Sequence, residues 1–281
     1  MRIVIATHKL LSTAFLVFAL TASANAADKP STSPPQRDPG TLRLMTYNIH
    51  AGKGTDGKLD LERLARIIRE ADVDVVAIQE VDRGTKRSGK IDEPRELARL
   101  TGMHAEFGKA IDHDSGDYGQ LILSRRPIQK FDVHKLPNED GHEQRIALVA
   151  QIPQPKPLPN LLLVGTHLHA KGGGDALRLA QAKEIVRLLK QDPRTSNHGP
   201  LLLGDLNSTP KSDAMKFLDE SWTDASKDSG PTIPAEKPAH KIDYVLVPKD
   251  SPWKVVSTKV LDEPVASDHR PVVVELQWKQ N

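Results

Sequence analysis

The pattern of apolar and polar positions after residue 40 alternates between strand-like runs and a helical repeat. Residues 42–50 (LRLMTYNIH) and 73–79 (VDVVAIQ) are mainly apolar runs that predict strands. Between them, residues 60–71 place apolar side chains at helical spacing, and Asp60 is suited to cap the start of that helix. The chain therefore begins its folded part with a strand–helix–strand unit.

The rest of the chain continues this mixture of strands and helices. The pattern predicts further strands at 118–124, 128–135, 145–152, 160–168, 200–204, 242–247, 253–261 and 271–277, and helices at 93–100, 174–190 and 212–219. Helices between strands predict a layered α/β fold, and the stretches rich in consecutive strands predict antiparallel pairing. With no repeat and no linker after residue 40, we expect one domain over 41–281.

The first 40 residues have a different character. Arg2 and Lys9 lie at or before the start of a short apolar run, and Ala24-Asn25-Ala26 follows it, so residues 1–26 predict a cleaved secretory signal peptide. The run is shorter than the ~20 residues of a membrane span, so we expect no stable span after cleavage. Residues 27–40 are rich in Pro, Ser and Asp and predict a disordered leader. We therefore expect an exported protein, periplasmic or secreted.

Charge and composition narrow the classes of partner. Lys and Arg total 39 against 37 acidic residues, but residues 1–26 hold two basic residues and no acidic one, so the mature chain is neutral. Proteins that grip long duplex DNA usually have a basic excess, which makes nucleic acid the less favoured substrate. Cysteine is absent, which excludes disulfides, thiolate metal sites and a cysteine nucleophile.

Polar side chains with metal-binding or acid–base capacity follow the ends of several predicted strands. These residues are Asn48, Glu80, His167, Asp205 with Asn207, and Asp268 with His269, while Asp243 begins a strand. Because strand side chains alternate between faces, we expect Asn48 to share a face with His50, and His167 with His169. Each segment alone is weak evidence, but together they indicate one site at the ends of the strands.

The same segments resemble the endonuclease/exonuclease/phosphatase (DNase I-like) superfamily from about residue 42 to 277. The matching motifs are TYNIH with Asn48, AIQEVD with Glu80, EQRIAL with Arg145, GTHLH with His167, GDLN with Asp205 and Asn207, KIDYVL with Asp243, and SDHRPV with Asp268 and His269. In YGQLILSRRPI, Gln120 stands where the family has Asn. The resemblance implies a four-layer α-β-β-α sandwich of two mixed, mainly antiparallel sheets flanked by helices.

Phosphate-ester hydrolysis explains why such residues would gather. A hard cation neutralises the charge on the phosphate and stabilises the leaving oxyanion. Mg²⁺, with Mn²⁺ as the alternative, takes carboxylate and amide oxygens, so we expect Glu80 as the main ligand. The other expected ligands or neighbours of the cation are Asn48, Asp205, Asn207 and Asp268.

The remaining roles concern the attacking water and the phosphate oxygens. Our first hypothesis makes His269 the base that activates the water, with Asp243 holding its far nitrogen. Asp205 is the competing base, with Asn207 positioning the water. His167 and Arg145 would bind the non-bridging oxygens and stabilise charge in the transition state.

Two cationic segments flank these motifs. Residues 52–58 (GKGTDGK) nearly spell a phosphate-binding P-loop, but Leu59 replaces the Ser or Thr that such loops need, so we expect this segment at the rim of the site. Residues 83–90 hold Arg83, Lys86, Arg87 and Lys90. That loop is either a solvated surface loop or a clamp for an anionic headgroup or a second phosphate.

Three functions are consistent with the sequence. The leading one is an exported, monomeric, Mg²⁺-dependent phosphodiesterase or phosphatase that acts on a small molecule or lipid headgroup. The second is an exported metal-dependent endonuclease that uses the same site. The third is a non-catalytic binding protein on the same scaffold, since fold alone does not prove activity.

Overall fold

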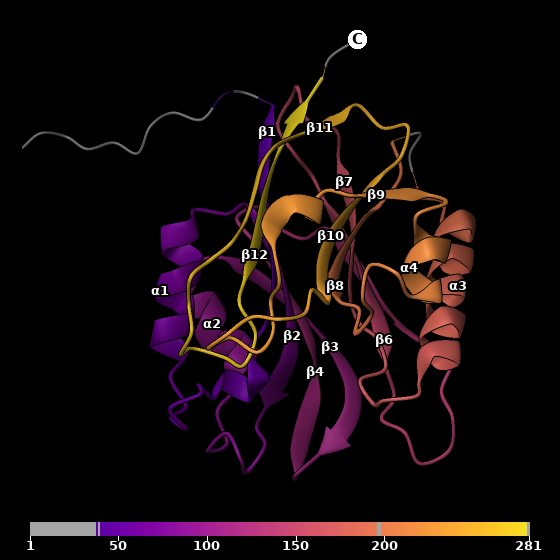
Figure 1. The fold of residues 1–281 in the computed structure, drawn as a ribbon. Helices are drawn as coiled ribbons and strands as arrows, with labels where there is room; N and C mark the ends of the chain where they lie inside the picture. Colours follow the sequence, from indigo (N-terminus) through magenta and orange to yellow (C-terminus); the bar gives the residue numbers. More distant parts are fainter. Residues whose placement is uncertain (1–37, 39, 196–197, 280–281) are drawn as a thin grey trace, which may run out of the picture. The chain divides into compact units, whose positions relative to one another are not determined.

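The strands of the protein form two mixed, six-stranded sheets (Figure 1). The computed structural model describes residues 38, 40–195 and 198–279. The first sheet contains, in spatial order, β11 (Trp253–Val260), β12 (Val272–Trp278), β1 (Thr41–Asn48), β2 (Val75–Arg83), β4 (Gly116–Ser124) and β3 (His104–His113). The second contains β5 (Lys130–Lys135), β6 (Ile146–Ile152), β7 (Leu161–His167), β8 (Leu201–Asp205), β10 (Asp243–Pro248) and β9 (Trp222–Asp224).

Helices cover the outer face of each sheet. They are α1 (Leu61–Ala71) and α2 (Glu93–Thr101) on the first sheet, and α3 (Asp175–Gln191) and α4 (Asp213–Leu218) on the second. Two short 3₁₀ turns, η1 (His50–Gly52) and η2 (Lys227–Ser229), lie in loops. In Figure 1 the two helix pairs flank the strands from opposite sides. The α-β-β-α sandwich that the resemblance implied is therefore confirmed.

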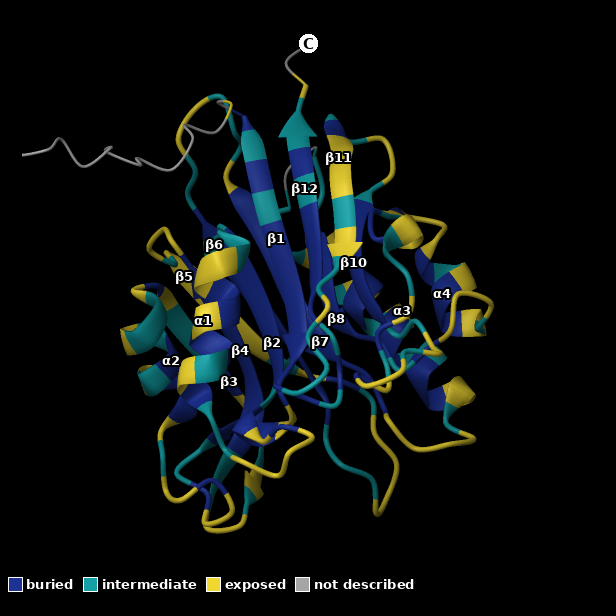
Figure 2. Ribbon diagram, turned by 60° about the vertical axis from the view of Figure 1, so that its left-hand side comes forward, coloured by how far each residue is buried: buried dark blue, intermediate teal, exposed yellow. Residues whose placement is uncertain are grey.

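The alternation of side chains along the strands creates three apolar layers. Leu42 and Leu44 of β1 point into the core between the sheets, whereas Met45 and Tyr47 point out toward α1. On the other sheet, Leu203 enters the central core and Leu202 packs toward α3 and α4. Burying apolar surface in this way is the main stabilising term for such a sandwich. Figure 2 shows the central strands buried along most of their length.

Local capping agrees with the sequence pattern. Asp60 accepts a hydrogen bond from the backbone nitrogen of Arg63 and so caps α1, as predicted. Two strands that the pattern did not predict are β3 and β9. β3 is an edge strand with the mixed sequence HAEFGKAIDH, and its burial does not alternate cleanly, so it leaves no clear period in the sequence. Within the described residues, no helix is long and apolar enough to cross a membrane.

The amino-terminal predictions fall on a part of the chain with no structural description. The predicted signal peptide 1–26 and the predicted leader 27–40, apart from residues 38 and 40, lie outside the described residues. Gly40 already joins the domain, since its carbonyl accepts a hydrogen bond from the backbone nitrogen of Trp278.

A buried acid, Glu93, supports the loops at one end of the first sheet. One of its oxygens accepts a hydrogen bond from the backbone nitrogen of Asp82 at 2.8 Å. Its other oxygen is buried without a hydrogen-bond partner among the described residues, and a Cβ on Gly52 would lie 3.2 Å from that oxygen. Burial raises the pKa of Glu93 to about 8, so the side chain is protonated at neutral pH.

We expect Glu93→Gln to change how stability depends on pH. The pKa of Glu93 in the folded protein, about 8, exceeds the ~4.3 of an unfolded chain, so native Glu93 favours folding at low pH and this advantage is lost as pH rises toward 8. In the native protein the free energy of unfolding therefore falls with pH, with a limiting slope of ~1.4 kcal/mol per pH unit, and the variant removes this fall. Urea denaturation from pH 5 to 9 should therefore give a flatter profile for Glu93→Gln.

The matched control is Glu96→Gln on the exposed side of the same helix. Its hydrogen bonds with Arg99 lower the pKa of Glu96, so replacing it should leave the profile above about pH 5 unchanged. If Glu93→Gln and the native protein gave parallel profiles up to pH 9, a neutral Glu93 would be ruled out.

Candidate active site

The site lies where the inner faces of the two sheets change from apolar to polar. On β1 the inward positions run Leu42, Leu44, Thr46 and Asn48, and the last of these is a buried amide. The same change occurs at the ends of other inward rows, which finish in Gln79, His167 and Asp205. All these polar groups are buried, so they must find partners among themselves. The sequence prediction of one site built from strand ends is thus consistent with where these side chains lie.

Three site residues form a single row across the second sheet. In the strand register, His167 of β7 is paired with Asp205 of β8, and Asp205 is paired with Asp243 of β10. Residues opposite one another on neighbouring strands project to the same face, so their side chains are neighbours. The result is two carboxylates side by side in the interior, which needs compensation by positive charge or protons.

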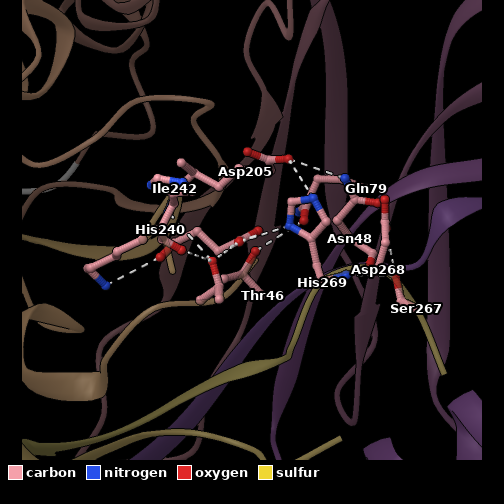
Figure 3. Close-up of polar contacts among 12 residues, drawn as sticks. Thr46, Asn48, Gln79, Asp205, His240, Ile242, Ser267, Asp268 and His269 are labelled. Atoms are coloured by element: carbon pink, nitrogen blue, oxygen red, sulfur yellow. Dashed lines mark hydrogen bonds and ion pairs between the residues drawn. The ribbon is translucent and has the colours of Figure 1, made fainter. Parts of the chain in front are cut away.

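His269 supplies that compensation from the loop before β12. Its Nδ1 lies 3.0 Å from Oδ2 of Asp243, and its Nε2 lies 3.8 Å from Oδ2 of Asp205. The hydroxyl of Thr232 also donates to Oδ2 of Asp243. Figure 3 shows His269 facing Asp205 across the site. The loop is held in place because Ser267 donates to the carbonyl of Asn48 at 2.7 Å, which ties it to the first sheet.

The electrostatics of this cluster favour a charged imidazole beside a carboxyl of unusually high pKa. Burial and the neighbouring charge of Asp243 raise the pKa of Asp205 to about 7. Burial by itself lowers the pKa of His269, but the charges of Asp243 and Asp205 outweigh this and raise it to about 10. At neutral pH the Asp243–His269 pair is therefore an ion pair, and Asp205 is the group that gains and loses a proton.

His167 differs from His269 in charge. Burial, followed by the charges of Arg145 and His269, lowers its pKa well below the ordinary value, so the ring is neutral. Nη1 of Arg145 lies 2.9 Å from Nδ1 of His167 and can only donate, which places the ring proton on Nε2. That nitrogen lies 3.4 Å from Oδ2 of Asp205. Arg145 is itself paired with Glu143 at 2.7 Å.

Glu80 reaches the site through a departure from regular strand geometry. The pairing of β2 with β4 shifts between Ile78 and Val81, and Glu80 has a left-handed φ of 58°. Such a bulge re-aims a side chain, and a non-glycine residue with positive φ is strained. The amide nitrogen of Asn48 then donates to Glu80 at 2.9 Å and to Asp205 at 3.2 Å, which links the two sheets.

Two other predicted site residues occupy the turns around this cluster. Asn207 has a φ of 46°, its backbone nitrogen donates to Oδ1 of Asp205, and its side-chain nitrogen donates to the carbonyl of Leu168. Asp268 lies at the rim with a side chain 45% exposed, and its Oδ1 is 3.9 Å from Nδ1 of His50. Asp268 therefore lies in contact with solvent, unlike the buried Asp205 and Asp243.

The donor groups of the site suit a hard divalent cation. Donor atoms of Asp205, Asp243 and His269 lie within 4.8 Å of one another, and within the described part of the chain Oδ1 of Asp243 is buried without a hydrogen-bond partner. Oε1 of Glu80 is held by Asn48. Carboxylate oxygens predominate, which is the chemistry that Mg²⁺ and Mn²⁺ prefer and that thiolate-seeking metals do not.

The expectation that Asn48 and His50 share a face is wrong. β1 ends at Asn48, and the chain then turns through His50 and Ala51 with left-handed φ values of 48° and 49°, so His50 is exposed while Asn48 is buried. β7 ends at His167, and His169 stacks on His142 with ring centroids 4.5 Å apart. Neither the turn at His50 nor the stacking of His169 on His142 could be inferred from a side-chain period of two.

Several residues that contact the site were not predicted from the sequence. Thr232 holds Asp243 from a loop, and Glu143 holds Arg145, yet neither belongs to a distinctive motif. Tyr118 is buried, and burial together with the charge of Glu80 raises its pKa well above the ordinary value. Gln120, which replaces the usual Asn of the resemblance, donates to the carbonyl of Ile146 at 3.0 Å.

Comparison with known proteins places this geometry among related folds. A sequence profile described as the Endonuclease/Exonuclease/phosphatase family matches residues 45–269. An endonuclease/exonuclease/phosphatase from Beutenbergia cavernae DSM 12333 is 27% identical, with a TM-score of 0.71 over 85% of this chain and 72% of that one.

Two more distant structures share the fold. A mannosyl-6-phosphatase from Bacteroides thetaiotaomicron VPI-5482 is 18% identical, with a TM-score of 0.70 over 84% of this chain and 100% of that one. The human Nocturnin catalytic domain, solved with a bound sulfate, is also 18% identical, with a TM-score of 0.68 over 86% of this chain and 96% of that one. The profile match spans most of the chain and contains the whole row of acid and imidazole groups. The chain belongs to the Endonuclease/Exonuclease/phosphatase family and is a metal-dependent hydrolase of phosphoester bonds.

Proposed function

We propose that the protein is an exported, Mg²⁺-dependent phosphatase or phosphodiesterase that acts on a small molecule or a lipid headgroup. The observation that carries the proposal is the buried row His167–Asp205–Asp243 closed by His269, with Arg145 and Glu80 at its edges. This row combines a titrating carboxyl with fixed hydrogen-bond donors in one water-poor place. Mn²⁺ is the natural substitute cation, and we propose a monomer.

A small anionic substrate is favoured over duplex DNA for two reasons. The mature chain is neutral in sequence, and most cations near the site are already paired, as Arg83 is with Asp117 and Arg87 is with Asp82. The mannosyl-6-phosphatase with the same fold supports a small phosphate ester as substrate. Export rests on the signal-like residues 1–26 alone.

Within this proposal the residues divide the chemistry as follows. His167 and Arg145 bind non-bridging oxygens through Nε2 and the guanidinium, and Arg145 fixes the tautomer of His167. Asp205 accepts the proton of the attacking water, since it titrates near neutrality, and Asn207 fixes its orientation. His269, held as a cation by Asp243, stabilises negative charge on the phosphoryl group. The divalent ion, when bound, neutralises phosphate charge and stabilises the leaving oxygen.

This division prefers Asp205 to His269 as the base. An imidazolium that is bonded to Asp243 has no lone pair for a proton, whereas a carboxyl of raised pKa is suited to the task. A non-catalytic binding protein on the same scaffold is disfavoured, because every group that this chemistry requires is present.

The direct test is hydrolysis of chromogenic phosphomonoesters and phosphodiesters. We expect turnover with Mg²⁺, loss of turnover with EDTA, and recovery when Mg²⁺ or Mn²⁺ is returned. Glu80→Gln should weaken Mg²⁺ binding in calorimetry and lower turnover by ~10²-fold or more, because it removes a carboxylate from the cation site. Glu70→Gln, on the exposed side of α1, is the matched control and should behave as the native protein. Equal turnover with and without EDTA would refute the proposal.

The pH dependence of kcat/KM distinguishes the two candidate bases. With Asp205 as base, kcat/KM should rise with pH up to about 7, level off, and fall near 10, where His269 loses its proton. Asp205→Asn should lower kcat/KM by ~10²–10⁴-fold and abolish the rise near 7, whereas His269→Gln should retain that rise at reduced rate. Asp213→Asn, an exposed change on α4, serves as control. A rate in the native protein that climbs steadily to pH 10 would instead assign the base to His269.

Plasmid nicking tests the competing nuclease function. With Mg²⁺ and low salt, we expect supercoiled DNA to survive under conditions in which the small phosphoester is consumed. A nuclease would nick the plasmid, and its rate would fall steeply between 50 and 200 mM salt. DNA binding releases counterions, so the affinity for DNA falls by a factor of ~10³ or more over that range. Nicking that is abolished by Asp205→Asn would replace the small-molecule proposal.

A further inference from the structure

A cavity of about 350 Å³ lies beside the turn that follows β1. Its walls are formed by His50, Ala51, Lys53, Gly57, Leu59 and Arg87. They come from the β1–α1 loop and from the loop that follows β2. These loops contain the two cationic segments singled out in the sequence, and the structure brings them to one cavity.

The cavity shares a wall with the catalytic cluster. The backbone nitrogen of His50 donates to Oδ1 of Asn48 at 3.1 Å, and Asn48 in turn donates to Glu80. The ring of His50 lies near Asp268 at the rim. His50 and Asn48 therefore connect the cavity wall with Glu80, beside which the phosphoester is proposed to lie.

Arg87 is fixed in the cavity wall by a buried acid. Both oxygens of Asp82 are engaged, accepting from Nε and Nη2 of Arg87 at 2.7 Å each, and Asp82 is fully buried. The guanidinium also lies over the ring of Tyr118, 5.4 Å from its centroid. These contacts leave Nη1 of Arg87 without a partner among the described residues, on a side chain that is 43% exposed. Such a preorganised fork suits a phosphate or carboxylate.

Lys53 adds a second cation to the cavity wall. Its backbone makes hydrogen bonds, whereas its side chain makes none among the described residues. Its backbone nitrogen donates to the carbonyl of His50, and a β-bridge pairs it with Leu59. Its exposed ammonium group has no ion pair or hydrogen bond among the described residues. Two cations of residues 83–90 differ from Lys53 in this respect, since Arg83 pairs with Asp117 and Lys90 donates to the carbonyl of Ser115. Of the four cations of residues 83–90, Arg87 is the one that lines the cavity.

We propose that this cavity binds a second phosphate group, so that the substrate carries two phosphates with one of them held by Lys53 and Arg87. Among the residues that the structure describes, no carboxylate lines the cavity, and the polar wall groups are an ammonium, a guanidinium and an imidazole. This inference rests on the proposed phosphoesterase function and narrows its substrate to a molecule with a second anionic group. A soluble bisphosphate and a phosphorylated lipid headgroup share this chemistry.

Non-hydrolysable phosphonates test the second site without turnover. Calorimetry with Mg²⁺ present compares alkane bisphosphonates of increasing chain length with the matched alkyl monophosphonates. In the native protein at least one bisphosphonate should bind about tenfold more tightly than its monophosphonate, as expected for an added charge-assisted contact. Lys53→Gln should abolish that difference and Lys53→Arg should restore it.

Lys58→Gln is the matched control, because Lys58 is exposed on the same loop but does not line the cavity. The proposal is overturned if no bisphosphonate binds more tightly than its partner, or if Lys58→Gln weakens binding as much as Lys53→Gln. A preserved affinity difference in a protein that hydrolyses no chromogenic phosphoester would support the second site and refute the proposed function separately.

Phosphate release then identifies the source of the second phosphate. One arm supplies a soluble sugar bisphosphate, and the other supplies phosphatidylcholine vesicles that contain phosphatidylinositol 4-phosphate. The proposal is supported if Lys53→Gln lowers kcat/KM for phosphate release about tenfold in either arm, through a higher KM and with kcat retained. The arm that responds identifies the substrate as soluble or lipid-bound. Release that Lys53→Gln leaves unchanged in both arms overturns it.

Discussion

Two carboxylates placed opposite each other inside the protein are the constraint on which the site depends. Asp205 and Asp243 are register partners on neighbouring strands, and both are almost fully buried. Two bare negative charges in such a place would strongly destabilise the fold. The protein meets this with an imidazolium between them, a hydroxyl from Thr232, and a raised pKa on Asp205. Burying the two carboxylates together therefore leaves His269 charged and Asp205 with a pKa near neutrality.

The two sheets make this arrangement rigid because each contributes part of it. The apolar core between them ends in Asn48 on one side and Asp205 on the other, and the hydrogen bond between these two residues joins the layers. Two strained backbone positions complete the site, the bulge at Glu80 and the left-handed Asn207. Strain of this kind persists only when the surrounding structure fixes it, and here hydrogen bonds to Asn48 and Leu168 hold the two side chains.

The sequence was sufficient for the residues whose place follows from strand alternation and strand ends. Asp60 as a cap, the apolar helix faces and the inward positions of His167 and Asp205 all follow from short-range periodicity. Residues that act across the fold could not be found in this way. Thr232 reaches Asp243 from a loop, and His169 turns to stack on His142 because β7 stops at His167. The sequence also does not show which charged residues are paired, and Arg83 of the cationic loop pairs with Asp117 in the fold.

Pairing of this sort shapes how the site selects its substrate. A surface that leaves its cations unpaired attracts any polyanion over a distance, and salt then controls its affinity. Here Arg83 and Arg87 are each fixed by a carboxylate, and Arg145 is held between Glu143 and His167. Their long-range field is therefore weak, while their remaining donors point in set directions. This pairing supports the proposed substrate class, because recognition by a few fixed donors at short range favours a compact anion of defined geometry over a long, uniformly charged polymer.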